Sequence, residues 1–266
     1  MAEKYSSEQL DKIIAVCRNT LAHDPKNATA HHDLAVALVE KGETDEAIAH
    51  FLQATSIAPK HVLSHYLLGI AYADKNMLQE AVTAWQRVLK LDKRHVNAHY
   101  FLGKVYALQG LTDAALLHLR KAKALKPSNV LIHHALAEVY VLNKEPSQAQ
   151  AAWQAVLRLH PSDRRALVNL SALCLEQGQY QECIDYGQDF LAAGRDDSRV
   201  RFNLGLAYLA QGELSAATQH LEQASTLNPT DIEVLLALAE VYHRQNDRER
   251  TDEALRRATA LRSLHS

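Results

Sequence analysis

The chain has 266 residues, of which 47% are hydrophobic, and its formal net charge is -2. Its charges do not suit a nucleic-acid partner, because residues 1–133 carry 16 Lys and Arg against 13 Asp and Glu, and the rest carry 13 against 18. The sequence contains no run of 18 apolar residues, so we expect no direct membrane insertion. The opening MAEKYSSEQL lacks the apolar core of a signal peptide. We therefore expect a cytoplasmic protein, or a periplasmic or membrane-anchored one if a signal or anchor has been removed.

Residues 1–27 contain the pattern of a single helix. Apolar side chains recur on one helical face, at Leu10, Ile13, Ile14, Cys17 and Leu21. Ser6 or Ser7 can cap the start of this helix, and Pro25 lies just beyond its end. We expect a half repeat that acts as an N-terminal capping helix.

From residue 28 the sequence repeats with one fixed period and without insertion. Each unit has the pattern of a helix, a turn and a second helix, and its residues are numbered here as positions 1 to 34. The seven units are 28–61, 62–95, 96–129, 130–163, 164–197, 198–231 and 232–265.

Several positions carry the same type of residue in most units. Position 7 is always Leu: Leu34, Leu68, Leu102, Leu136, Leu170, Leu204 and Leu238. Position 8 is always small, which lets two helices approach closely. Position 15 is Gly or Asn in every unit except one, where it is Lys144, and these residues suit the left-handed backbone that ends a helix. The residue before a unit is a good N-cap in five cases: Asn27, Asn129, Asp163, Asp197 and Asp231.

The pattern resembles the tetratricopeptide repeat family. The resemblance rests on Leu at position 7, Gly or Ala at position 8, Tyr at position 11, Ala at position 20, a bulky residue at position 24 and Pro at position 32. The family implies an all-α fold, a right-handed superhelical α-solenoid of seven helical hairpins preceded by the half repeat. It also implies a concave face formed by the first helix of each unit.

No catalytic or metal-binding motif stands out from the repeat. The chain has no glycine-rich phosphate loop, no nucleophile elbow and no zinc-site cysteine spacing, so we expect no enzyme activity and no cofactor. His31, His65, His99 and His133 recur at position 4 of successive units, and equivalent positions on neighbouring helices are too far apart for one metal ion to bind them all. We interpret them as packing residues and expect no metal site.

Cys174 and Cys183 lie at facing positions of one helical pair. We expect two small buried thiols, with a disulfide or redox switch as the alternative.

In the family, positions 2, 5, 6, 9, 12 and 13 usually face the concave groove. Here these positions are apolar and aromatic in the first units and polar or cationic in units 164–197 and 198–231. The Arg165/Asn169 pair recurs in the next unit as Arg199/Asn203, and such side chains can bind a peptide backbone or a carboxylate. We predict a peptide-binding site made of Tyr66, Ile70, Tyr100, Phe101, Lys104, Arg165, Asn169, Arg199, Phe202 and Asn203. The alternative is that some of these apolar residues belong to the core between neighbouring units.

These features favour a non-catalytic scaffold that binds an extended or helical segment of a protein partner. One alternative is a platform that self-associates through the outer face of its last helix, where Ala254, Ala258 and Leu261 are expected. Another is a targeting subunit cut from a longer chain.

Overall fold

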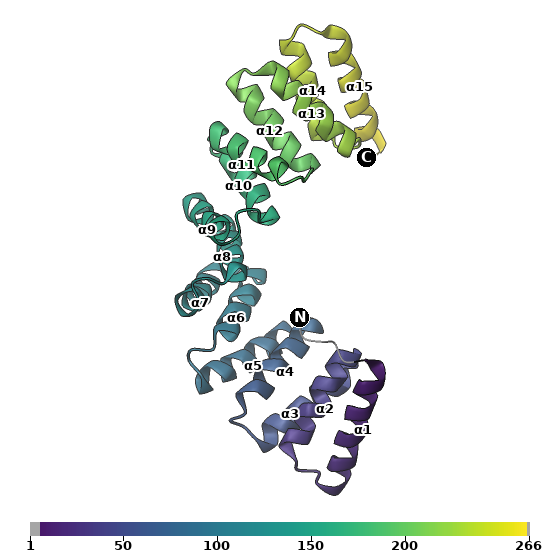
Figure 1. Cartoon of the computed structure of the whole chain (residues 1–266), viewed down its shortest axis with the longest axis vertical. Coiled ribbons are helices and arrows are strands. Elements are labelled where there is room, and N and C mark those ends of the chain that lie inside the picture. Colours follow the sequence, from purple (N-terminus) through teal and green to yellow (C-terminus); the bar gives the residue numbers. More distant parts are fainter. Residues whose placement is uncertain (1–5, 265–266) are drawn as a thin grey trace. The chain divides into compact units, whose positions relative to one another are not determined.

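The structure is a computed structural model that describes residues 6–264. The predicted unit boundaries at residues 1 and 265 lie outside this range. Within it, the chain forms fifteen α-helices and no strand (Figure 1). The helices are α1 (Ser7–His23), α2 (Ala28–Lys41), α3 (Thr44–Ile57), α4 (Val62–Asp74), α5 (Leu78–Leu91), α6 (Val96–Leu108), α7 (Thr112–Leu125), α8 (Val130–Leu142), α9 (Pro146–Leu159), α10 (Arg164–Glu176), α11 (Tyr180–Ala192), α12 (Ser198–Gln211), α13 (Leu214–Leu227), α14 (Ile232–Arg244) and α15 (Arg248–Leu264).

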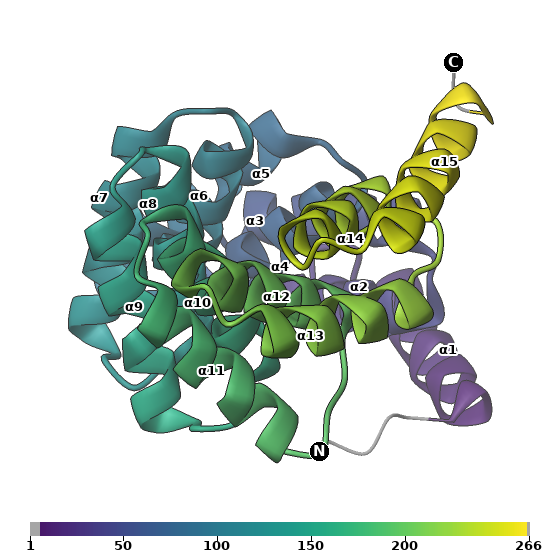
Figure 2. The ribbon, with the colours of Figure 1, turned by 90° about the horizontal axis from the view of Figure 1, so that it is seen from above.

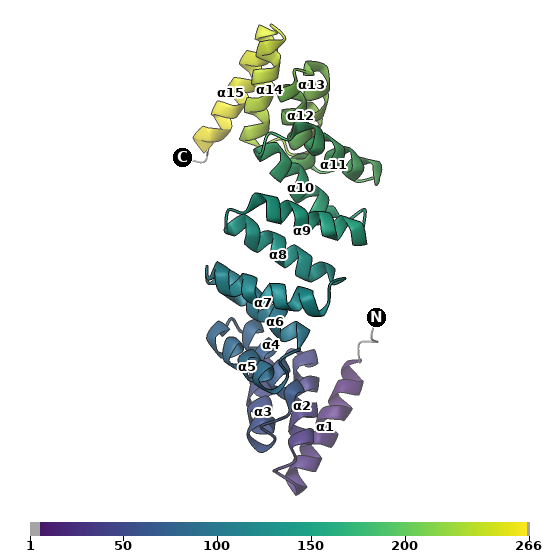
Figure 3. The same cartoon turned by 90° about the vertical axis from the view of Figure 1, so that its left-hand side faces the viewer.

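The helices divide into two compact units, residues 1–135 and residues 136–266. In the first unit each helix from α1 to α7 packs against the next, and α2 also contacts α4 (Figure 3). In the second, the same succession runs from α9 to α15, and α12 also contacts α10 and α14 (Figure 2). Each unit is therefore a stack of antiparallel helical pairs, which confirms the all-α solenoid.

Local sequence signals account for the helix starts. The seven helices that open a pair begin at Ala28, Val62, Val96, Val130, Arg164, Ser198 and Ile232, the residues at which the predicted repeat units begin. The side chains of all five predicted N-caps accept backbone N–H groups, for example Asp163 from Ala166 at 2.8 Å. His95 also caps a helix, because its Nδ1 accepts the N–H of Ala98 at 3.1 Å.

The core lies between the two helices of each pair and between neighbouring pairs. The leucine at position 7 is buried in all seven units. Small residues at position 8 permit the close approach, since a Cβ added at Gly103 would lie 2.5 Å from Leu119 and one added at Gly205 would lie 2.5 Å from Leu221. The pattern of large and small residues therefore sets the distance between the paired helices.

The turn inside each helical pair has the same backbone geometry. Position 15 has a positive φ in all seven units: Gly42, Asn76, Gly110, Lys144, Gly178, Gly212 and Asn246. The sequence predicted this conformation for the six Gly and Asn residues. Lys144, at φ 56°, adopts it too.

Candidate functional site

In the first unit, α4 and α6 present an apolar and aromatic surface. Ile70, Tyr66 and Tyr100 are half-buried on it, and Lys104 is exposed. Leu63, one turn before Tyr66 on α4, is 48% exposed and adds an aliphatic side chain. We call these five residues the α4–α6 face.

An aromatic cluster beneath this face holds its rings in place. The Phe101 ring stacks on the buried Trp85 ring at a centroid distance of 5.2 Å, and Tyr100 meets Phe101 edge to face, also at 5.2 Å. The Tyr66 ring lies 6.2 Å from Phe101. The Lys104 ammonium lies 5.8 Å from the centre of the Tyr100 ring. Phe101 therefore supports the face from below, whereas Tyr66 and Tyr100 combine packing with exposed ring surface.

In the second compact unit, residues 136–266, both predicted arginines form ion pairs. Arg165 pairs with Glu138, and an Arg199 nitrogen lies 2.7 Å from Glu233. Asn169 donates to the carbonyl of Arg165 on its own helix at 2.7 Å. Because both ion pairs are largely exposed, each contributes only about 0.2–1 kcal/mol and can be exchanged for a carboxylate of another molecule.

Asn203 does not lie on the surface, unlike the exposed polar residue expected from the sequence. It is only 2% exposed, and its amide donates to the hydroxyl of Ser171 at 3.1 Å. The reason is that α10 and α12 contact one another, so position 6 of one unit faces position 8 of the unit before it. Phe202 is 7% exposed and lies beneath the Arg199 guanidinium, 5.1 Å from its ring centre.

Sequence reasoning missed the acidic partners of the two arginines, Glu138 and Glu233. Each lies on the helix that opens a neighbouring pair, at position 9 or position 2. Aligning the repeat units would have revealed Glu233, because it and Arg199 both lie at position 2, but not Glu138, because it lies at position 9 and Arg165 at position 2. It also missed Leu236 on α14, which is 43% exposed.

The four histidines at position 4 make the same hydrogen bond in each of four units. Nε2 of each lies within hydrogen-bond distance of the carbonyl oxygen six residues earlier, at 3.1 Å for His31, 3.1 Å for His65, 3.2 Å for His99 and 2.6 Å for His133. Because a carbonyl only accepts, Nε2 carries the proton and donates. These histidines therefore tie each opening helix to the turn before it. Among the described residues, no cluster of three or more His, Cys, Asp or Glu side chains has the arrangement of a metal site.

All three cysteines are buried and free, which confirms the interpretation of Cys174 and Cys183 as buried thiols. Burial raises the pKa of the Cys174 thiol and that of the Cys183 thiol to about 12. Neither forms a reactive thiolate near neutral pH.

No helix within residues 6–264 has the length and apolar character needed to cross a membrane.

Comparison with solved structures shows the same fold. A tetratricopeptide repeat protein fragment from Cytophaga hutchinsonii is 16% identical with a TM-score of 0.74, and the match covers 86% of this chain and 94% of that one. PilF from Pseudomonas aeruginosa is 20% identical with a TM-score of 0.64, over 80% and 97% of the two chains. PilW, described as a type IV pilus biogenesis factor, is 17% identical with a TM-score of 0.60, over 77% and 98%. No curated protein sequence matches the chain.

Family models match most of the chain. Two models described as tetratricopeptide repeat match residues 5–71 and residues 66–130 and 134–198, and a third, described as TPR repeat, matches residues 196–246. Together with the helical pairs and the residues that recur within them, these matches show that the chain belongs to the tetratricopeptide repeat family.

Proposed function

We propose that the protein is a non-catalytic scaffold that binds an extended or helical segment of a partner protein on the exposed faces of its opening helices. Membership of the tetratricopeptide repeat family supports the general role of protein interaction. The observation that carries the proposal is the α4–α6 face, where Leu63, Ile70 and two tyrosines form an apolar surface beside one cation. Exposed apolar surface of this kind is typical of sites that bind other proteins.

The α4–α6 face has the chemistry of a peptide-binding surface. Tyrosine rings offer large contact areas at a low cost in conformational entropy, and the cluster with Phe101 and Trp85 holds them in place before binding. Lys104 adds attraction for an acidic residue. The preferred segment therefore carries apolar side chains and at least one carboxylate.

The second unit offers a different set of contacts. Arg165 and Arg199 bind a carboxylate of the partner in place of Glu138 or Glu233, and Asn169 lies one turn after Arg165 on α10. Phe202 is buried and only supports the Arg199 guanidinium from beneath. Asn203 is left out of the proposed site because of its burial.

The test is affinity capture from source-cell extract, comparing the wild-type chain with the variant Leu63→Asp/Lys104→Glu. Both residues are exposed, so the variant keeps the fold, which circular dichroism checks. Leu117→Asp on α7, where Leu117 is 53% exposed, is the matched control. We expect a protein that the wild type and the control retain and the double variant loses. Retention of every partner by the double variant would place binding elsewhere.

A second candidate function is self-association through α15. Leu255 lies at position 24, where the residues of most other units are fully buried, yet it is 43% exposed. Thr259 and Ala260 extend this outer face of α15. Ala254 and Ala258, which we expected there from the sequence, are only 5% and 4% exposed and belong to the core instead. Sedimentation of the wild type and of Leu255→Asp tests the candidate, with Leu227→Asp on α13 as control. A concentration-dependent mass that only Leu255→Asp abolishes supports self-association, and a constant monomer mass excludes it.

A further inference from the structure

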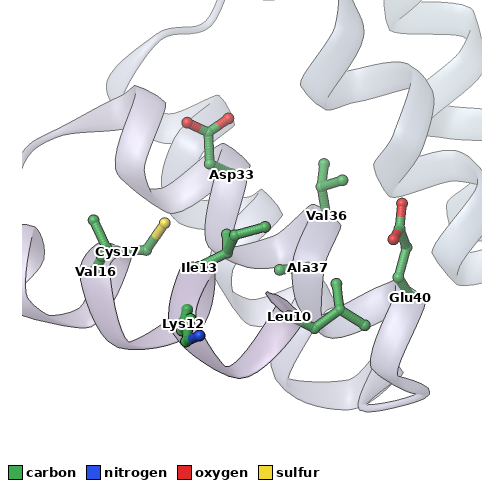
Figure 4. A pocket seen from close by; sticks show the side chains of 9 residues that line it. All are labelled: Leu10, Lys12, Ile13, Val16, Cys17, Asp33, Val36, Ala37 and Glu40. Carbon is green, nitrogen blue, oxygen red and sulfur yellow. The ribbon is translucent and has the colours of Figure 1, made fainter. Parts of the chain in front are cut away.

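A groove of about 470 Å³ opens between α1 and α2 (Figure 4). Ile13 and Val16 line it from α1, and Val36 lines it from α2. Val16 is 65% exposed, an unusual value for an apolar residue beside a core. The groove also holds one cation, Lys12, and two carboxylates, Asp33 and Glu40.

The repeat shows what covers the equivalent surface elsewhere in this chain. A shift by one repeat unit takes Val16 to His50 and Cys17 to Phe51 on α3. There, α2 lies on both α3 and α4. The Nδ1 of His31, on α2, is 2.9 Å from the Nδ1 of His50, and the buried Phe51 ring meets His32 edge-on at 5.8 Å. The α1–α2 groove is therefore the place where a helix that opens a pair would lie.

The charges of the groove indicate the polar side chains of such a helix. Asp33 occupies position 6 of repeat unit 28–61. In repeat unit 198–231 the residue at position 6, Asn203, bonds to Ser171 at position 8 of the preceding opening helix. A helix over the groove would thus bring a hydrogen-bond donor to Asp33. Glu40, seven residues further along α2, would face the last turn of that helix, where a basic residue is favourable.

The sizes of the side chains in α1 indicate which helix sequence fits the groove. Position 24 is usually bulky and lies against a small residue at position 8, but α1 has Cys17 there. Unit 164–197 has a similar exchange, with Gly187 at position 24 and Ser171 at position 8 of α10. In α10, Leu167 at position 4 packs in the cluster that also includes Tyr186 at position 23, the position that Val16 holds in α1. The sequence of α10 thus has the side chains that the groove requires.

We propose that the α1–α2 groove binds an amphipathic helix of a partner protein, lying on α1 and α2 as α2 lies on α3 and α4. Its apolar side chain contacts Val16, its hydroxyl or amide donor bonds to Asp33, and its basic last turn lies near Glu40. This site is separate from the α4–α6 face, so either one can fail without the other.

The probe is a labelled, lactam-stapled peptide with the sequence of residues 164–176, carrying Cys174→Ala and Glu176→Lys. It is titrated against the full-length chain and read by fluorescence anisotropy. We expect saturable one-to-one binding that Val16→Asp weakens at least tenfold. Leu117→Asp on α7, where the leucine is 53% exposed, leaves binding unchanged. No saturable binding by the wild type, or equal loss in both variants, overturns the proposal.

Charge reversal at Glu40 provides a second, independent measurement. The wild type should prefer the peptide with Lys at its last residue over the one with Glu by about two- to fivefold, as for an exposed ion pair. Glu40→Lys should invert this preference, and an unchanged preference contradicts the proposed orientation. Sedimentation tests whether a second copy of this chain, rather than a partner protein, fills the groove. A wild-type dimer that Val16→Asp dissociates would show that it does, and would overturn the proposal of a partner helix.

Discussion

Lys144 adopts a backbone conformation that costs a side-chain-bearing residue about 1–2 kcal/mol, with φ at 56°. We expect Lys144→Gly to raise the free energy of unfolding by about 0.5–1 kcal/mol, because glycine relieves this strain but gives the unfolded chain more freedom. Urea unfolding measures the change. Lys144→Ala should give no such gain, and Asn76→Gly should give a smaller one, because asparagine tolerates the left-handed region. A loss of stability in Lys144→Gly would contradict the strain argument.

Gly187 is a helical glycine whose missing side chain is required by packing. A Cβ at this residue would lie 2.7 Å from two atoms of the buried Leu204. Glycine to alanine in a helix normally stabilises by about 1 kcal/mol, but here we expect Gly187→Ala to destabilise by about 1–3 kcal/mol through overpacking. Thermal unfolding of Gly187→Ala, Leu204→Val and the double variant tests this expectation. The double variant should lose less than the sum of the single losses, whereas strict additivity would show that the two residues do not interact.

The residues whose structure could not be predicted from the sequence share one property: a neighbouring repeat unit determines their environment. Nothing in a lysine side chain predicts a positive φ, and Lys144 has one because the register of the repeat demands it. Asn203 matches Asn169 in sequence spacing, but it is buried against Ser171 of the preceding opening helix. Properties that depend on the local segment, such as the cap at Asp163, were predicted correctly.

At the scale of the helical pair, two histidines share one proton in α6 and α7. Nε2 of His99 donates to the carbonyl of Lys93, so its Nδ1 accepts, and the Nδ1 of His118 lies 3.0 Å away and donates to it. Burial, with smaller contributions from His99 and Lys121, lowers the pKa of His118 to about 4. Burial also lowers the pKa of His99.

This pair makes stability depend on pH in acid. The unfolded histidine has a pKa near 6.5, so below this pH the unfolded chain binds protons that the folded pair does not accept. Stability is therefore complete above pH 6.5 and falls as the pH decreases towards about 4. Ala84 and Ala152 occupy the position of His118 in other repeat units, so His118→Ala introduces a residue that the repeat already uses there. This variant should reduce the slope of the decline by up to about 1.4 kcal/mol per pH unit. Urea midpoints at pH 7.5, 6 and 5 measure it, and parallel curves for wild type and variant would contradict the assignment.

At the scale of the whole molecule, the regular period of the repeat is what made the fold predictable. Leucine at one position, a small residue after it and, in most units, a Gly or Asn eight positions after the leucine were enough to predict an all-α solenoid from the sequence alone. The binding surface was less predictable, because burial depends on how far neighbouring helices approach. Tyr66 and Phe101 follow the same groove-facing pattern, yet Phe101 lies in the supporting cluster. Sequence periodicity thus identifies the helix that carries a side chain better than the surface that the side chain reaches.

The clusters of buried residues predict that unfolding stays local. Leu34 belongs to a cluster formed by α1 to α5, whereas Leu238 belongs to one formed by α12 to α15, and the two share no residue. Repeat arrays are stabilised by nearest-neighbour interfaces, so a cavity weakens the adjoining helices first. We expect Leu34→Ala to cost about 2–5 kcal/mol locally and to accelerate hydrogen exchange in α1 to α5 while leaving α12 to α15 protected.

Leu238→Ala should give the reciprocal pattern, with faster exchange in α12 to α15 and unchanged protection in α1 to α5. Mass spectrometry of peptides from the full-length chain resolves both patterns. Uniform loss of protection in both variants would mean that the chain unfolds as a single cooperative body, and the nearest-neighbour description would then be wrong. Local loss would instead mean that each compact unit can unfold by itself. A partner bound to one compact unit would then protect that unit without stabilising the other, because binding stabilises only the folded region that contains the binding site.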